Sequence, residues 1–137
     1  MPRYATTTDL ARIGIASNAL ASIDTAAKED ALDACSSLAD GYLSGRYTLP
    51  LSAWADDLRL HVAGMAAFRL LAARGYDPNR GADAAIRMLW DDAIRWLERV
   101  SSGSVTPAGI VDATPEEQEE IPHVAAVTNA SRGWCRR

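Results

Sequence analysis

The chain has 137 residues, of which 48% are hydrophobic and 23% charged, with a formal net charge of −4. This length suits one domain with a sizeable apolar core, and the acidic balance argues against a surface that binds nucleic acid throughout. No apolar run approaches the roughly 20 residues of a membrane helix, and Met1-Pro2-Arg3-Tyr4 does not resemble a signal peptide, so we expect a soluble, cytoplasmic protein without membrane contact.

The N-terminal part predicts a short helix followed by a long one. Thr6-Thr7-Thr8-Asp9 has the spacing of a capping box, in which the first residue is the N-cap and the aspartate reaches back to it. We predict the first long helix over about residues 25–44, because apolar side chains recur every three or four positions at Ala31, Leu32, Cys35, Leu38, Ala39 and Tyr42. We expect Gly45 to end this helix in a left-handed conformation.

The second long helix is expected to begin after Pro50, with Ser52 as its cap and Asp56 and Asp57 near its positive end. One face carries Trp54, Leu58, Val62, Met65, Phe68 and Ala72, and further leucines make it the most buried helix. Gly75 is placed to stop it.

The third long helix is expected over residues 82–101, after a possible start at Asp77-Pro78. Its apolar stripe is Ile86, Leu89, Trp90, Ala93, Leu97 and Val100. No run alternates apolar and polar residues as a strand would. The sequence therefore predicts an all-α fold: a small bundle of three long helices plus a short N-terminal helix, with an extended C-terminal tail.

The composition changes after the third long helix. Residues 1–111 hold 11 bases and 13 acids, whereas residues 112–122 hold five acids and no base, and residues 132–137 hold three arginines and no acid. We predict a helical domain over residues 1–103, and an acidic linker with a C-terminal docking tail over residues 104–137.

The residues do not indicate an enzyme. The sequence has no G-x-S-x-G, C-x-x-C, P-loop or Rossmann glycine pattern. His61 is expected to pack within its helix, and His123 has no neighbouring cysteine or second histidine with which to bind zinc. We predict no catalytic, metal-binding or cofactor-binding residues, and no disulfide between Cys35 and Cys135.

The stretch from Asp40 to Leu51, called the corner below, connects the first two long helices. Its side chains Arg46 and Tyr47 have two interpretations. In the structural one, Arg46 pairs with Asp40 or with a carbonyl at a helix end while Tyr47 packs into the bundle. In the functional one, both residues form a contact with another subunit. The two interpretations are compatible.

The C-terminal tail is the other candidate interaction site. Trp134 lies among Arg132, Arg136 and Arg137, and tryptophan and arginine are enriched at binding hot spots. The tail could dock on a partner, fold back onto its own bundle, or bind nucleic acid through its basic and aromatic residues. We favour the partner.

The corner also indicates a family. Its sequence, DGYLSGRYTLPL, resembles the D-G-Y-L-x-x-R-Y-x-L-P-L pattern of the Mu-like phage neck family of small head–tail connector proteins. The start, Tyr4-Ala5-Thr6-Thr7-Thr8-Asp9-Leu10, is similar to the opening of that family, as are Trp96-Leu97-Glu98-Arg99-Val100 and Gly103 to its later helix. The resemblance covers about residues 4–105.

This resemblance implies a structural protein without covalent chemistry. Neighbouring copies would form a ring, expected to be dodecameric, beneath the portal protein and would dock the next neck or tail-terminator protein. DNA would pass through the lumen without sequence-specific binding. The protein would lie in the virion neck, at the head–tail interface, and in the host cytoplasm during assembly.

The rival hypothesis is a small helical DNA-binding or regulatory protein that uses residues 42–60 as a helix-turn-helix. Such a protein needs polar or basic side chains at the start of its recognition helix. Asp56 and Asp57 stand there instead and would repel phosphate. A third class, a small enzyme, would need a convergent set of titratable residues that the sequence does not offer.

Overall fold

The computed structural model describes residues 2–13, 17–75 and 81–111. In this part of the chain there are five helices and no strand, which confirms the all-α prediction. The helices are α1 (Thr7–Arg12), α2 (Ser17–Ala21), α3 (Thr25–Leu43), α4 (Asp56–Ala72) and α5 (Gly81–Ser102). The three long helices lie close to their expected positions, whereas the N-terminal region forms two short helices instead of one.

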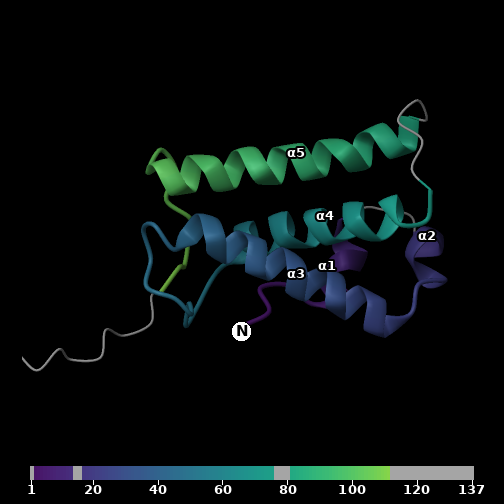
Figure 1. The fold of residues 1–137 in the computed structure, drawn as a ribbon, viewed down its shortest axis with the longest axis horizontal. Coiled ribbons are helices and arrows are strands. Elements are labelled where there is room, and N and C mark those ends of the chain that lie inside the picture. The colour runs from purple at the N-terminus through teal and green to yellow at the C-terminus, as the bar shows by residue number, and fades with distance from the viewer. Residues whose placement is uncertain (1, 14–16, 76–80, 112–137) are drawn as a thin grey trace, which may run out of the picture.

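Helix α4 is the centre of the bundle and packs against the other four helices. In Figure 1, α5 runs along one long side of the bundle, with α3 and α4 beneath it and α2 at one end. Side chains of α4 that are fully buried include Leu58, Val62, Ala63, Met65, Ala66 and Ala67. A Cβ at Gly64 would lie 3.4 Å from the Cβ of Leu89, so small residues allow α5 to approach closely.

The N-terminal segment is fastened by the predicted capping box. The Asp9 backbone amide donates to the Thr6 hydroxyl, and the Asp9 carboxylate accepts from the Thr6 amide at 2.8 Å. Tyr4 and Leu10 on either side are 1% exposed. The segment therefore belongs to the same core as the long helices.

The start of α4 differs from the prediction that Ser52 caps it. The helix begins at Asp56, because Ser52 is already engaged elsewhere: its amide and hydroxyl both donate to the carbonyl oxygen of Val111, at 2.9 and 3.0 Å. Ala53 forms an antiparallel bridge with Val111. A contact with a residue almost sixty positions later thus keeps this stretch extended.

The two glycines expected to end helices behave differently. Gly75, just beyond α4, has a φ of 103°, as expected for a left-handed stop. Gly45 is absent from the positive-φ glycines of the described residues, so its prediction was wrong. The amides of Arg46 and Tyr47 both donate to the Leu43 carbonyl at 2.9 Å, and this tightened turn ends α3 without a left-handed residue.

Half of the stripe predicted for α5 is fully buried, namely Ala93, Leu97 and Val100, whereas Ile86, Leu89 and Trp90 are half-buried. The possible start at Asp77-Pro78 lies outside the described residues. None of the helices in the described ranges is long and apolar enough to span a bilayer.

Candidate functional site

Arg46 connects the corner to the C-terminal end of α5. Its Nη1 atom donates to the carbonyl oxygens of Val100 and Val105, at 2.9 and 3.0 Å. Val100 lies in the last turn of α5, where carbonyls lack helical partners and a cation interacts favourably with the helix dipole. Of the two structural partners proposed for Arg46, the helix-end carbonyl is right and Asp40 is wrong. The guanidinium also lies 5.3 Å from the ring centroid of Tyr47.

Asp40 is instead the partner of Tyr4. The Tyr4 hydroxyl donates to the Asp40 carboxylate, and both residues are buried. Burial, together with this hydrogen bond, raises the pKa of Tyr4 well above its usual value. The backbone amide of Tyr4 donates to the Ser36 hydroxyl at 3.1 Å, so the N-terminal segment is held to α3 at two points.

Trp54 connects the same segment to the residues just after the corner. Its Nε1 atom donates to the Tyr4 carbonyl oxygen at 2.9 Å. The two rings meet edge to face, with centroids 4.9 Å apart and planes at 84°. These hydrogen bonds and the ring contact join three parts of the chain: the N-terminal residues, α3 and the residues just before α4. We call these three parts the fastened unit.

Tyr47 packs against the core as a half-buried side chain, as the structural interpretation predicted. Its hydroxyl oxygen is buried without a hydrogen-bond partner among the described residues. An unsatisfied buried hydroxyl is destabilising. Packing of the ring and its contact with the Arg46 guanidinium are what hold Tyr47 in place.

An open pocket of about 660 Å³ lies beside the corner and is called the corner pocket below. Its lining residues are Pro2, Asp40, Leu49, Pro50 and Leu51. Four of these five are apolar, and the Asp40 carboxylate supplies a hydrogen-bond acceptor. Its volume lies within the range of known ligand pockets, which are mostly apolar with a few polar groups.

The segment after α5 returns to the corner and covers the start of α4. The Ala108 amide donates to the Asp57 carboxylate at 2.9 Å. Gly109 has a φ of 62°, and a Cβ there would lie 3.1 Å from the Cβ of Ala55. Pro107 is buried, and Val105 and Ile110 pack against the core. The predicted domain boundary after residue 103 stays a prediction.

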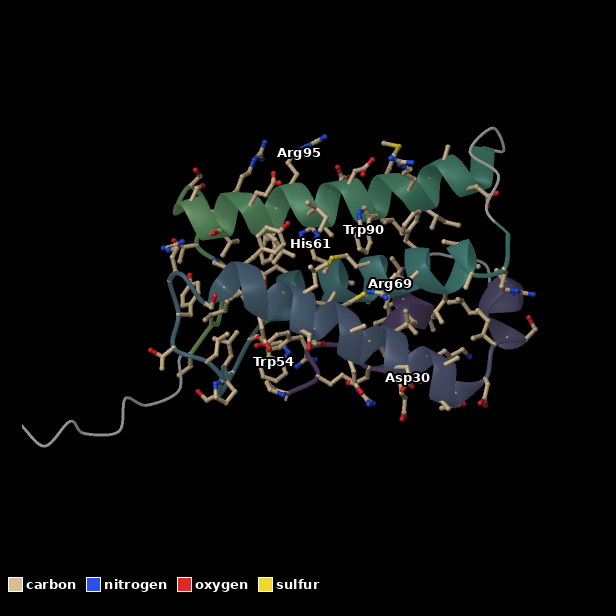
Figure 2. All side chains as sticks on the ribbon, viewed as in Figure 1. Asp30, Trp54, His61, Arg69, Trp90 and Arg95 are labelled. Atoms are coloured by element: carbon tan, nitrogen blue, oxygen red, sulfur yellow. The ribbon has the colours of Figure 1, made fainter. Side chains whose placement is uncertain are left out.

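His61 is packed between two helices. In Figure 2 it lies in the layer between α4 and α5, and its ring stacks on that of Trp96 with centroids 4.5 Å apart. Burial lowers the pKa of His61, with Asp57 and Asp92 opposing the shift. Within the described ranges, no group of three or more potential ligand side chains could hold a metal ion.

Two of the six predicted interface residues, Arg46 and Tyr47, lie in the described structure, and both face the molecule's own bundle. Trp134, Arg132, Arg136 and Arg137 lie outside the described residues. The interface role of all six stays a prediction. Sequence reasoning missed the pairing of Tyr4 with Asp40 and the pocket beside it. The run Leu49-Pro50-Leu51, two leucines in a connecting loop, was the available signal.

Comparison with known proteins settles the family. Residues 4–126 match the family described as "Bacteriophage Mu, Gp36". The chain belongs to this family. The match includes the N-terminal segment, the corner and the segment that returns to it, so the fastened unit lies within the part that defines the Gp36 family.

Two curated proteins are similar to the chain. The "Mu-like prophage FluMu protein gp36" of Haemophilus influenzae is 35% identical over 115 residues, which are 84% of this chain and 74% of that protein. "Gene product J" of Escherichia phage Mu is 32% identical over 100 residues, which are 72% of this chain and 66% of that protein. The expected Mu-like phage family is confirmed, and neither of these two proteins is named as an enzyme.

Proposed function

We propose that the chain is a structural head–tail connector of a tailed phage or prophage. Copies of it would form a ring beneath the portal, extend the DNA channel and dock the next neck or tail protein. The observation that carries this proposal is the corner. Its family pattern forms a surface held by hydrogen bonds, with an open apolar pocket, and Val111, the last described residue, pairs with Ser52 and Ala53 close to this pocket.

Two residues of the family pattern make contacts that would stabilise a rigid subunit in the wall of a ring. Arg46 ties the corner to the end of α5, and Asp40 holds the N-terminal segment through Tyr4. A ring closes through heterologous contacts when the rotation between neighbours divides a full turn, which requires subunits of fixed shape. The tail with Trp134 would reach the portal or a neighbouring copy and become ordered there.

The charge of the chain is compatible with a DNA conduit. A net charge of −4 provides little attraction for phosphate, so DNA would pass without being held. This supports a lumen in which DNA moves freely, and we propose no sequence-specific contact with it.

Packing around α4 weighs against the helix-turn-helix alternative. A recognition helix offers its first turn to the major groove, but the first turn of α4 carries Asp56 and Asp57. The Asp57 carboxylate accepts a hydrogen bond from Ala108, so the returning segment occupies the side from which DNA would be read.

Inactivation of the gene in its phage or prophage tests the proposal. Loss of a connector should leave filled heads and complete tails that do not join, while transcription of the phage genes remains normal. A changed transcription pattern with normal joining would contradict the connector role and favour the regulatory alternative.

A further inference from the structure

The corner pocket is a site without an occupant among the described residues. Pro2, Leu49, Pro50 and Leu51 provide apolar walls, and Asp40 provides a carboxylate acceptor. The Asp40 carboxylate already accepts from the Tyr4 hydroxyl through Oδ1. A fitting occupant therefore has a large apolar body with a hydrogen-bond donor at its edge.

A tryptophan side chain has this chemistry, because its indole is apolar apart from one N–H donor. The chain has four tryptophans, and three of them already have partners in the bundle: Trp54 bonds to Tyr4, Trp90 packs on Phe68, and Trp96 stacks on His61. The fourth, Trp134, lies in the tail. Other large apolar side chains after Val111 are Ile121, Val124 and Val127, which carry no donor.

Val111, the last described residue before the tail, lies close to the pocket. The Val111 amide donates to the Ala53 carbonyl oxygen at 3.0 Å, and the Val111 carbonyl accepts from the Ser52 amide at 2.9 Å. Ser52 follows Leu51, which forms part of the pocket wall. Val111, the last described residue, therefore pairs with residues that directly follow the pocket wall, at the same end of the bundle as the corner (Figure 1).

The length of the tail favours binding of Trp134 in the pocket of the same molecule over binding in the pocket of another molecule. Between Val111 and Trp134 lie 22 residues, and a flexible linker of that length would have a root-mean-square span of about 25 Å. Such a tether gives an effective concentration on the order of millimolar. At micromolar protein concentration the intramolecular contact is strongly favoured. Arg132, Arg136 and Arg137 would lie near the acidic Asp40.

We propose that in the unassembled protein the corner pocket binds the chain's own Trp134. The contact covers the apolar corner surface and holds the tail back. A consequence, which rests on the proposed connector function, concerns assembly. The portal or a neighbouring copy must displace Trp134 from the corner pocket before that partner can dock on the corner.

A paramagnetic label near Trp134 tests this contact in the free protein, without any assembly partner. Cys135 is adjacent to Trp134, whereas Cys35 is fully buried and burial raises the pKa of its thiol to about 11, so a thiol-specific nitroxide attaches at Cys135. We expect loss of amide signal intensity at Gly41, Leu49 and Leu51 in isotope-labelled full-length protein. Signals of Met88, exposed on α5, should keep their intensity.

Variants with the same label test whether the signal loss depends on Trp134 and on the corner pocket. Trp134→Ala, labelled in the same way, should restore the signals of the pocket residues. Leu49→Glu should restore the signals of the remaining pocket residues, while Met88→Glu, the same change at an exposed leucine-sized side chain elsewhere, should not. Unchanged signal loss in Trp134→Ala, or equal loss over the whole bundle, would overturn the proposal.

A mixture of nitroxide-labelled chains and isotope-labelled chains separates the two possible sources of the tail. Signal loss at the pocket residues in this mixture, in which the nitroxide and the observed nuclei lie on different chains, would mean that a neighbouring copy's tail fills the pocket, and would overturn the intramolecular contact. Because these measurements need no portal, their failure leaves the connector function standing. Conversely, a failure of connector function would not remove the contact.

Discussion

Arg46 donates a hydrogen bond to the Val100 carbonyl oxygen at 2.9 Å, across 54 positions of sequence. A second bond from the same nitrogen reaches Val105 at 3.0 Å. One side chain in the loop after α3 thus closes the C-terminal end of α5. The family pattern at the corner thereby includes a residue that holds the bundle together at a distance in sequence.

Replacement of Arg46 by alanine should therefore destabilise the protein. Two carbonyls lose a charge-assisted donor, and because the side chain is largely exposed we expect a loss of about 1–2 kcal/mol in the free energy of unfolding. Chemical denaturation measures it. Arg95→Ala, which removes an exposed α5 arginine 3.7 Å from Asp92, should change little. Equal stabilities of Arg46→Ala and the unmodified protein would show that the two bonds do not stabilise the corner.

The Tyr4–Asp40 hydrogen bond should be an important contact of the N-terminal segment. Tyr4→Phe leaves the buried Asp40 carboxylate without this donor and should lower the free energy of unfolding by about 1–3 kcal/mol. A double-mutant cycle with Asp40→Asn measures the coupling. Strictly additive losses would mean that the two side chains stabilise the fold independently.

His61 should make stability depend on pH near neutrality. Burial lowers its pKa in the folded protein below the usual 6.5, so the unfolded chain binds the proton more readily. The free energy of unfolding should therefore fall as pH decreases from about 7 to 5, a window in which carboxylates contribute little. His61→Phe, which keeps an aromatic ring against Trp96, should flatten this dependence.

His123 is present both in the unmodified protein and in His61→Phe. The difference between their free energies of unfolding as a function of pH therefore belongs to His61. Identical slopes in the two chains would contradict the burial of the His61 ring.

Truncation after Val111 should separate folding from assembly. All five helices and the bridge between Ala53 and Val111 lie within the shortened chain, so its helical circular dichroism and cooperative melting should persist. Binding to the portal should weaken, because Trp134 is removed. A truncated chain that assembles as well as the full chain would show that the tail has no docking role.

Local patterns predicted the helices well, because their causes lie within a few residues. The capping box at Thr6 and the apolar stripe of α5 needed only neighbouring side chains. Ser52 failed as a cap because pairing with Val111, far along the chain, keeps residues 52 and 53 extended, so that α4 begins only at Asp56. Asp40 failed as the partner of Arg46 because Tyr4, 36 positions earlier, reaches it instead.

The local part of the candidate site could likewise be predicted from the sequence, and the part built by distant residues could not. The corner was identified from its pattern, but the corner pocket also needs Pro2 from the start of the chain, and periodicity does not reveal that such distant residues converge. The contacts of residues 104–111 with Asp57 and Ala55 were likewise missed, because no apolar repeat marks that segment.

Electron microscopy of the purified protein mixed with its cognate portal tests the connector function most directly, with light scattering on the free protein as reference. A connector should form a ring on one end of the portal, coaxial with the DNA channel. Absence of any association, together with salt-sensitive binding of the free protein to duplex DNA, would contradict the connector role and support the helix-turn-helix alternative.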